Sequence, residues 1–265
     1  MPACRLCGLL PRECLRMDNK KGMLFIVGIG PGSLDDMTLR ARAVIERCDI
    51  VVGYTTYIKL IEPLIAGKQV IASAMTRERE RCCRALDEAR SGKTVALISS
   101  GDSGVYGMAG LVLELMGSSS SAAEIPVEIV PGVPAFIAAA AALGALLMND
   151  CAIVSLSDLL TPWEIIEKRL SAAAAGDFVT CLYNPKSSAR TEQIERAIKI
   201  FLQHRGADTP AAIVRSVSRP EEKIIRTTLA RVPDFDIDML CLVIIGNSAT
   251  VTQGAWMITR RGYAV

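Results

Sequence analysis

The sequence predicts an α/β protein of two domains, each a sheet covered by helices. Three observations support this prediction. Apolar runs alternate with helical patterns along the chain, the first strands are apolar without interruption, as at residues 95–98, and several strands end in turns rich in glycine and proline. Uninterrupted apolar strands are typical of parallel sheets that are buried on both faces. With 265 residues, of which 51% are hydrophobic, the chain can bury one large core or two smaller ones.

The first half is predicted to form a mostly parallel sheet. Its strands are expected at residues 24–28, 49–54, 69–73, 94–100 and 127–130. Helices are expected between them, at residues 38–48, 76–91 and 106–116. Strands that alternate with helices build parallel sheets, because the helix carries the chain back to the edge from which the strand started.

The second half continues this alternation. Helices are expected at residues 135–147, 162–175 and 190–204, and Pro162 suits a first helical turn, where its missing N–H has no partner to lose. Strands are expected at residues 152–156, 178–183, 211–216 and 240–245, with a further pair around 224–229. We therefore expect domains at residues 23–132 and 133–265, after a loose extension at residues 1–22.

The composition excludes several classes of protein. The formal charge of +2 is too balanced for a nucleic-acid-binding surface. The longest apolar stretch, residues 135–148, is too short to span a bilayer, and residues 1–22 lack the apolar segment of a signal peptide. We therefore expect a cytoplasmic protein that binds neither nucleic acid nor membrane.

The cysteines do not form a disulfide framework, because there are nine of them, scattered over predicted strands and helices. Cys4, Cys7 and Cys14 could hold a metal ion or an iron–sulfur cluster, but no fourth ligand is near in sequence. We expect no bound metal.

The turn at residues 28–32, Gly-Ile-Gly-Pro-Gly, follows the first predicted strand. It is not a dinucleotide fingerprint, since Ser33 stands where the third glycine is needed. Pro31 also removes one of the N–H donors that a pyrophosphate loop requires. A nicotinamide oxidoreductase is therefore a poor reading of this turn.

Residues 100–107, Ser-Gly-Asp-Ser-Gly-Val-Tyr-Gly, follow the strand at 94–100. A glycine-rich segment at the carboxyl end of a parallel strand lies where α/β sheets bind ligands, although a plain turn with Asp102 as a helix cap would look the same. Small or turn-forming residues also follow other strands, at residues 130–135, 182–187 and 245–248. Together these strand ends predict a ligand bound against backbone.

These segments resemble the tetrapyrrole class of S-adenosylmethionine methyltransferases. The resemblance rests first on Gly-x-Gly-Pro-Gly at 28–32, Gly-Asp-x-x-x-Tyr-Gly at 101–107 and Val-Pro-Gly at 130–132. Within the class, the C17-methyltransferases that act on precorrin-3B or cobalt-factor III in cobalamin biosynthesis are similar in three further segments. These are residues 155–164, 182–187 and 259–263. The resemblance extends from about residue 23 to residue 263.

The resemblance implies two α/β domains with S-adenosylmethionine in the cleft between them, usually in a homodimer. The residues that it assigns to the cofactor are Pro31, Ser100, Gly101, Asp102, Val105, Tyr106, Pro134, Ala135, Asn184, Ser216 and Val217. Those assigned to the tetrapyrrole are Gly28, Gly30, Gly32, Lys186 and Arg260. On this interpretation, Pro31 faces the methyl donor and the glycines leave room for a bulky macrocycle. The chain departs from the family at Asn149, where many members have histidine.

The chemistry implied by the resemblance is methyl transfer to C17 with contraction of the ring. A sulfonium donor is already activated, so the enzyme mainly positions donor and acceptor. Ring contraction also needs proton transfers, and Asp158 is the candidate acid or base. Alternatively, Asp158 caps the helix that begins near Pro162, or orients a loop.

The acetate and propionate groups of such a substrate suit cationic partners. Besides Lys186 and Arg260, the candidates are Arg190, Arg215, Arg219 and Arg261, each of which could equally be a solvated surface charge. Trp163 and Trp256 are expected in the core, with stacking on the macrocycle as the alternative.

Other functions stay open at this point. The acceptor could be uroporphyrinogen III, another precorrin, diphthine or ribosomal RNA, although the segment at 155–164 and the balanced charge favour none of these. A non-catalytic metal carrier using Cys4, Cys7 and Cys14 is a reading from a different class. The sequence leaves open whether the substrate contains cobalt.

Overall fold

The computed structural model describes residues 22–118 and 125–264. Residues 1–21 lie outside the described part, and with them the expectations for Cys4, Cys7 and Cys14. The chain divides into two compact units, which are described separately. The first contains the described residues up to Ile29 and Thr38–Gly132, and the second contains Gly30–Met37 and the residues from Val133 onward. The segment Gly30–Met37 thus belongs with the second unit, whereas the sequence-based proposal assigns it to the first domain.

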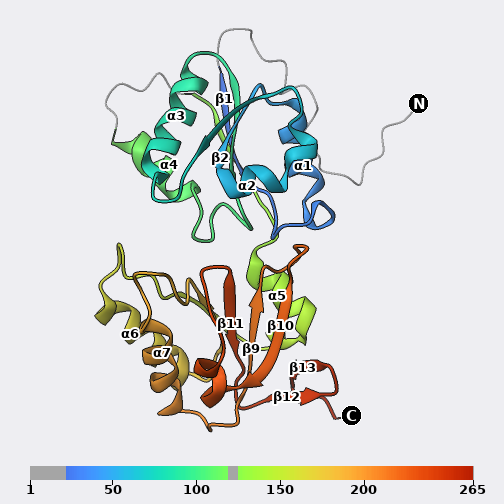
Figure 1. Ribbon diagram of the computed structural model, residues 1–265, viewed down its shortest axis with the longest axis vertical. Coiled ribbons are helices and arrows are strands. Elements are labelled where there is room, and N and C mark those ends of the chain that lie inside the picture. The colour runs from blue at the N-terminus through green and yellow to red at the C-terminus, as the bar shows by residue number, and fades with distance from the viewer. Residues whose placement is uncertain (1–21, 119–124, 265) are drawn as a thin grey trace, which may run out of the picture. The chain divides into compact units, whose positions relative to one another are not determined.

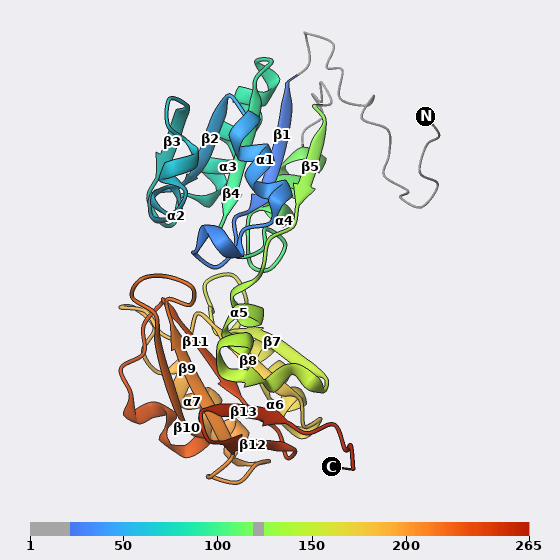
Figure 2. The same ribbon diagram turned by 90° about the vertical axis from the view of Figure 1, so that its right-hand side faces the viewer.

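The first unit contains a five-stranded sheet in the order β3-β2-β4-β1-β5, and all of its neighbouring strands are parallel (Figures 1 and 2). Its strands are β1 (Met23–Gly28), β2 (Ile50–Tyr54), β3 (Gln69–Ser73), β4 (Thr94–Ser99) and β5 (Val127–Val130). The parallel sheet predicted for the first half is confirmed. All five strands end at the same edge of the sheet.

Helices cover both faces of this sheet. They are α1 (Leu39–Arg47), α2 (Thr55–Leu60), α3 (Glu78–Arg90) and α4 (Ala109–Gly117), with a 3-10 turn at Glu62–Leu64. Leu24 and Ile26 of β1 pack with residues of α3 and α4, while Phe25, which points to the other face, lies under Arg47 of α1. Figure 1 shows α1 and α3 on opposite sides of the strands.

The second unit contains a mixed sheet in the order β10-β9-β11-β8-β7. Its strands are β7 (Cys151–Ser155), β8 (Val179–Tyr183), β9 (Pro210–Arg215), β10 (Lys223–Thr228) and β11 (Cys241–Ile245). Strands β7 and β8 are parallel, and β11 is antiparallel to both β8 and β9. The carboxyl ends of β7, β8 and β9 therefore meet the start of β11 at one edge.

Three helices cover the second sheet: α5 (Ala135–Leu143), α6 (Trp163–Ala175) and α7 (Gln193–Leu202). The core on one face joins α6 and α7 to Leu182 and Ile213, and the core on the other face joins α5 to Cys181 and Val214 (Figure 2). The 3-10 turns of this unit are Leu34–Asp36, Leu146–Met148 and Leu229–Asp234. In the described part of the chain, no helix is both long and apolar enough to cross a membrane.

The helix predicted at residues 135–147 is too long. Helix α5 ends at Leu143 because Gly144 has φ +135°. Residues that carry a side chain rarely adopt this backbone conformation, and it ends a helix. Gly144–Ala145 then forms the short strand β6, which pairs in parallel with β13 (Trp256–Thr259). With β12 (Thr250–Gln253), these strands form a third, small sheet that the sequence did not predict.

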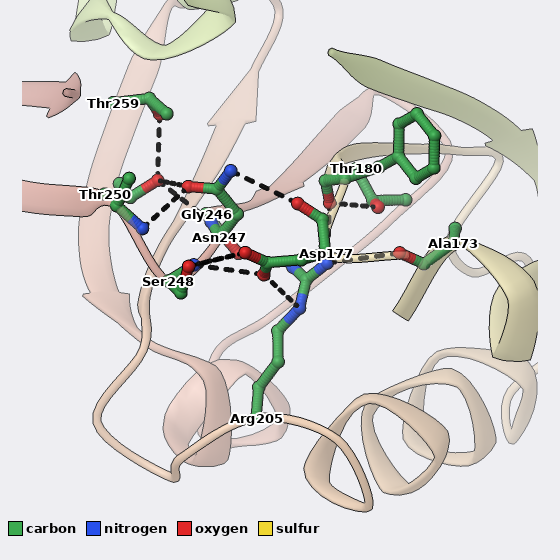
Figure 3. A network of polar contacts seen from close by, with 11 residues as sticks. Ala173, Asp177, Thr180, Arg205, Gly246, Asn247, Ser248, Thr250 and Thr259 are labelled. Atoms are coloured by element: carbon green, nitrogen blue, oxygen red, sulfur yellow. Dashed lines mark hydrogen bonds and ion pairs between the residues drawn. The ribbon is translucent and has the colours of Figure 1, made fainter. Parts of the chain in front are cut away.

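A buried arginine ties several segments of the second unit together (Figure 3). The Arg205 side chain is 4% exposed, and its guanidinium donates to the carbonyl oxygens of Gly246, Phe178 and Ala173. Its Nε lies 3.8 Å from Oδ1 of Asp177. Burial lowers the pKa of Arg205, and the nearby Asp177 carboxylate opposes that shift. One cation therefore holds the end of β11, the turn before β8 and the last turn of α6.

Candidate functional site

Three glycines at the strand ends of the first unit touch one another. A Cβ on Gly132, after β5, would lie 2.2 Å from O of Gly101 and 2.6 Å from C and O of Gly28. A Cβ on Gly28 would lie 2.6 Å from O of Gly101. Since real Cβ contacts are longer than this, only glycine fits at these points of β1 and β5. The ends of β1, β4 and β5 thus form a tightly packed backbone platform.

The Asp102 side chain links two segments of this platform by hydrogen bonds. Its Oδ2 accepts from N–H of Gly132 at 3.0 Å, and its Oδ1 accepts from N–H of Gly104 at 2.8 Å. One carboxylate therefore joins the turn after β4 to the segment after β5. The alternative reading of Asp102 as a helix cap is wrong, since α4 begins only at Ala109 and its cap position, Met108, has no side-chain cap.

The turn after β4 contains strained backbone. Gly101 has φ +66° and Tyr106 has φ +53°, a region that non-glycine residues seldom occupy. Tyr106 is 53% exposed, although it is a large aromatic residue. A strained residue persists where its surroundings determine the conformation, and such residues concentrate at ligand sites. The sequence-predicted residues Ser100, Gly101, Asp102, Val105 and Tyr106 are all on this one turn.

In the second unit, the predicted residues Pro134, Ala135 and Asn184 meet around Tyr183. The hydroxyl oxygen of Tyr183, at the end of β8, accepts from N–H of Phe136 at 3.1 Å, in the first turn of α5. A first-turn N–H has no partner within its helix, so Tyr183 supplies one. This role of Tyr183 was not predicted from the sequence, although Pro134 before an apolar segment indicates the start of the helix whose N–H it accepts.

Asn184 continues this arrangement with a strained backbone at φ +51°. Its Nδ2 donates to Oγ of Ser155 at 2.9 Å, and its carbonyl oxygen accepts from Nη2 of Arg190 at 3.0 Å. Arg190 also lies 3.5 Å from Oγ of Ser157 and 3.3 Å from Sδ of Met239. The ends of β7 and β8 are therefore held together by polar contacts. Arg190 serves in the protein as a link between loops.

Ser216 and Val217, which follow β9, are both buried, and Ser216 has φ +52°. N–H of Ser216 donates to the carbonyl oxygen of Leu240 at 3.0 Å. Asp238, two residues before Leu240, accepts from Nε of Arg215 at 2.9 Å, from N–H of Leu240 at 2.9 Å and from the Cys241 thiol at 3.2 Å. Arg215 is thus paired with a carboxylate.

Burial raises the pKa of Asp238, but the hydrogen bonds from Cys241, Arg215 and Leu240 outweigh it, and the net pKa lies below its usual value. Burial raises the pKa of the Cys241 thiol to about 11, so at neutral pH this sulfur stays protonated and can donate. The Asp238 carboxylate is therefore charged at neutral pH.

The Asp238 contacts predict a pH-dependent difference in stability. The folded-state pKa of Asp238 lies below the unfolded value, so the carboxylate stabilises the fold above the unfolded pKa of about 3.9, and this contribution is lost as pH falls through the folded pKa. Asp238→Asn should lower Tm by about 1–2 °C at pH 7, because a half-exposed pair is screened by solvent. Thermal melts of both proteins from pH 7 to pH 3 should converge at the acid end. A difference that grows as pH falls would contradict this prediction.

A cavity of about 330 Å³ lies beside this cluster, between the segment after β8 and the segment before β11. It is lined by Lys186, Ser187, Ser188, Ile237, Asp238, Met239 and Leu240. Leu240, which lines the cavity, accepts the hydrogen bond from N–H of Ser216. Its lining combines three apolar side chains with two serines, one carboxylate and one cation, and its volume is at the lower end of the range for small-molecule sites.

Asp158 lies on the exposed loop between β7 and α6. Its Oδ2 accepts from Nε2 of Gln193 at 2.8 Å. The helix-cap reading is wrong, because the cap position of α6 is Pro162 and no side chain caps it. The carboxylate therefore links this loop to the start of α7. The role of Asp158 as an acid or base stays a prediction. Beside it, Leu159 and Leu160 are 76% and 93% exposed.

The glycine-proline turn is packed against protein. Gly30 has φ +80°, and a Cβ there would lie 2.9 Å from O of Asp36. A Cβ on Gly32 would lie 2.3 Å from Cγ of Arg219. A side chain at Gly28, Gly30 or Gly32 would therefore overlap protein atoms, and the expectation that these glycines leave room for a macrocycle stays a prediction. Contact of these residues with substrate stays a prediction.

The remaining predicted residues are dispersed. Arg260 and Arg261 are exposed, and the carbonyl oxygen of Arg260 accepts from Nδ2 of Asn149 at 3.2 Å. Trp163 is buried under Arg196, as expected of a core residue, whereas Trp256 is 56% exposed and its predicted core position is wrong. Among residues 22–118 and 125–264, no group of three or more His, Cys, Asp or Glu could hold a metal ion.

Known proteins are similar to this chain in sequence and in fold. A "Probable cobalt-factor III C(17)-methyltransferase" of Salmonella typhimurium is 48% identical over 243 residues, which cover 92% of this chain and 100% of that protein. A "Cobalt-factor III methyltransferase" of Priestia megaterium is 47% identical over 245 residues, which cover 92% of this chain and 45% of that protein. The chain thus spans about half the length of the second relative.

Two solved structures extend this comparison. The methyltransferase CobJ matches with a TM-score of 0.86 at 36% identity, over 91% of this chain and 100% of CobJ. A uroporphyrin-III C-methyl transferase of Thermus thermophilus, solved as a complex with S-adenosyl homocysteine, matches with a TM-score of 0.64 at 22% identity, over 85% of this chain and 92% of that one, and shares the fold.

The family assignment rests on the length of the match. The profile of the family described as "Tetrapyrrole (Corrin/Porphyrin) Methylases" matches residues 23–233, which is most of the chain and includes strand ends of both units. The resemblance and the α/β fold expected from the sequence are both confirmed. The chain belongs to the tetrapyrrole (corrin/porphyrin) methylase family.

Proposed function

We propose that this protein transfers a methyl group from S-adenosylmethionine to C17 of a precorrin-type tetrapyrrole, in cobalamin biosynthesis. The observation that carries the proposal is the 48% identity to a probable cobalt-factor III C(17)-methyltransferase along that protein's whole length. The substrate is precorrin-3B or cobalt-factor III, and ring contraction accompanies the transfer, as the resemblance implies.

The strand ends fit a methyl donor that is held mainly by backbone. Glycines remove side chains from the ends of β1, β4 and β5, and positive φ angles at Tyr106, Asn184 and Ser216 turn backbone groups away from regular pairing. We assign the donor to Pro31, Ser100, Gly101, Asp102, Val105, Tyr106, Pro134, Ala135, Asn184, Ser216 and Val217.

S-adenosylmethionine, when bound, supplies a methyl group that is already activated. The residues of this chain then have to fix geometry, and the structure supports that role. Asp102 holds the turn after β4 by two N–H donors, Tyr183 fixes the start of α5, and Arg190 fixes Asn184. Each contact reduces the freedom of a segment that would touch the donor, which is how positioning accelerates a transfer.

Proton transfer in the ring contraction is assigned to Asp158. Gln193 orients its carboxylate, and the loop that carries it is accessible. Lys186 and Arg260 are the proposed partners of the substrate carboxylates, because both are cations for which no ion pair with a carboxylate is found among the described residues. A homodimeric state and a cytoplasmic location stay predictions from the sequence.

The proposed reaction is tested by mass spectrometry of the product. Purified protein with S-adenosylmethionine should add one methyl group to precorrin-3B, cobalt-factor III or both, and nuclear magnetic resonance should locate it on C17. Asp102→Ala should lower kcat/KM by about 10–100-fold, since it frees two segments of the donor site. Glu114→Ala, on the exposed side of α4, is the matched control. Methylation of uroporphyrinogen III instead, or of no tetrapyrrole, would overturn the proposal.

A further inference from the structure

The side chain of Arg219 joins two segments that are distant in sequence. Its Nε donates to the carbonyl oxygen of Pro31 at 3.0 Å, across 188 residues of chain. Pro31 is buried in the glycine-proline turn, and Arg219 lies two residues after Val217. Both Pro31 and Val217 are residues that we assign to the methyl donor. Arg219, which was a candidate for substrate carboxylates, is therefore engaged with backbone of the same unit.

The loop that carries Arg219 is strained and is closed by its own hydrogen bonds. Ser216 and Ser218 have φ +52° and +57°, and neither is glycine. N–H of Arg219 donates to O of Ser216 at 3.1 Å, and N–H of Ser218 donates to the Glu222 carboxylate at 2.7 Å. Two residues with positive φ in one short loop imply that its surroundings impose the shape of the loop that carries Arg219.

The absence of a side chain at Gly32 leaves room for the Arg219 side chain. A Cβ on Gly32 would lie 2.3 Å from Cγ and 3.0 Å from Nε of Arg219, and 3.1 Å from O of Ser218. Gly32 has no positive φ, so backbone conformation does not require glycine there. The requirement comes from the arginine stem, which lies directly over the Cα of Gly32. Pro31 supplies the acceptor and Gly32 supplies the space.

We infer that Arg219 is a positioning residue for the methyl donor: it holds the glycine-proline turn in register with Ser216 and Val217, so that these segments form one preformed binding edge. The inference rests on the proposed function. It predicts that loss of Arg219 costs affinity for the donor because Pro31 is no longer held, even though the guanidinium itself need not touch the ligand.

The first test is calorimetric binding of S-adenosylhomocysteine to the full chain. Arg219→Met should raise Kd by about tenfold, because the hydrogen bond that holds Pro31 is lost, with Tm lowered by no more than about 2 °C. Arg219→Lys should restore most of the affinity, because an ammonium can still donate to Pro31. Arg226→Met, a neighbouring exposed arginine of β10, should bind as the wild type does. Failure of the wild type to bind would overturn the proposed function, whereas equal binding by Arg219→Met would overturn only the inference.

The second test is a double-mutant cycle between Arg219 and Gly32. Gly32→Ala should weaken binding about as much as Arg219→Ala, because the new Cβ displaces the arginine stem. With Cγ already removed, Gly32→Ala should add less than about a twofold loss, since contacting residues are not additive. Additive losses would show that the two residues act separately and would overturn the inference. A large fall in Tm that Arg219→Lys does not restore would likewise assign Arg219 to the stability of the fold.

Discussion

Replacing Gly132 with alanine is expected to destabilise the first unit by about 3 kcal/mol, the upper part of the range for overpacked sites. The new Cβ would lie 2.2 Å from O of Gly101 and 2.6 Å from C and O of Gly28. All of these are backbone atoms, so no side chain can rotate to relieve the overlap. The ends of β1, β4 or β5 must shift, and Asp102 then loses the hydrogen bond that it accepts from N–H of Gly132.

The measurement is hydrogen exchange of the β1 and β4 amides together with a calorimetric melt. The Tm should fall by roughly 10 °C for a domain of this size. Gly110→Ala is the matched control: Gly110 lies in α4 of the same unit, and a Cβ there would meet nothing within 4 Å. Since alanine is the better helix former, that variant should gain up to about 1 kcal/mol. Equal melts for the two variants would show that the three strand ends are not packed as described.

Replacing Arg205 with methionine is expected to cost the second unit about 3 kcal/mol, the upper part of the range for a lost hydrogen bond to a charged group. The carbonyl oxygens of Gly246, Phe178 and Ala173 would each lose the guanidinium donor, and Asp177 would lose its nearby cation (Figure 3). The oxygens of Phe178 and Ala173 keep a second donor, from Thr180 and from N–H of Phe178. Methionine fills similar volume, so the loss arises from the missing hydrogen bonds of a buried cation rather than from a void. Arg205→Lys should recover part of the loss, since an ammonium can reach some but not all of these carbonyls.

Urea denaturation followed by circular dichroism measures this effect. The midpoint should fall while the slope m stays unchanged, because the surface exposed on unfolding is the same. Arg231→Met is the control, as Arg231 forms an exposed pair with Asp234 and its loss should change stability by less than about 0.5 kcal/mol. A midpoint for Arg205→Met that matches this control would mean that the buried contacts contribute no net stability.

The strongly patterned elements could be predicted from the sequence. The apolar run at 95–98 becomes the central part of β4, and the five strands and the helices α1, α3 and α4 of the first unit lie where they were predicted, whereas α2 was not predicted. Local patterns suffice there because each parallel strand is buried on both faces. The helix at 135–147 was predicted too long, because nothing local distinguishes Gly144 as a terminator from a glycine tolerated inside a helix. Strands β12, β13 and β6 were missed because short strands depend on partners distant in sequence.

The motifs of the site could be predicted from the sequence, but the contacts that explain why those residues are needed could not. The turn at 100–107 and the segments at 28–32 and 130–132 were identified correctly as strand ends. That Gly28, Gly101 and Gly132 need one another, and that Gly32 makes room for Arg219, depends on contacts between distant segments. No pattern within a window of sequence contains such information. The same holds for Arg215 and Arg190, whose charges were candidates for substrate until the structure showed Asp238 and Asn184 beside them.

The membership of Gly30–Met37 in the second unit has a consequence for synthesis on the ribosome. Chains emerge from the N-terminus, so the strands of the first sheet are complete once β5 has emerged. The turn at Pro31 emerges among the earliest of these residues, yet its arginine partner follows 188 residues later. While most of the protein is translated, the carbonyl oxygen of Pro31 therefore lacks its hydrogen bond from Arg219. We expect a stalled chain ending shortly before Arg219 to show protease cleavage near Pro31, and a chain extended past Arg219 to resist it.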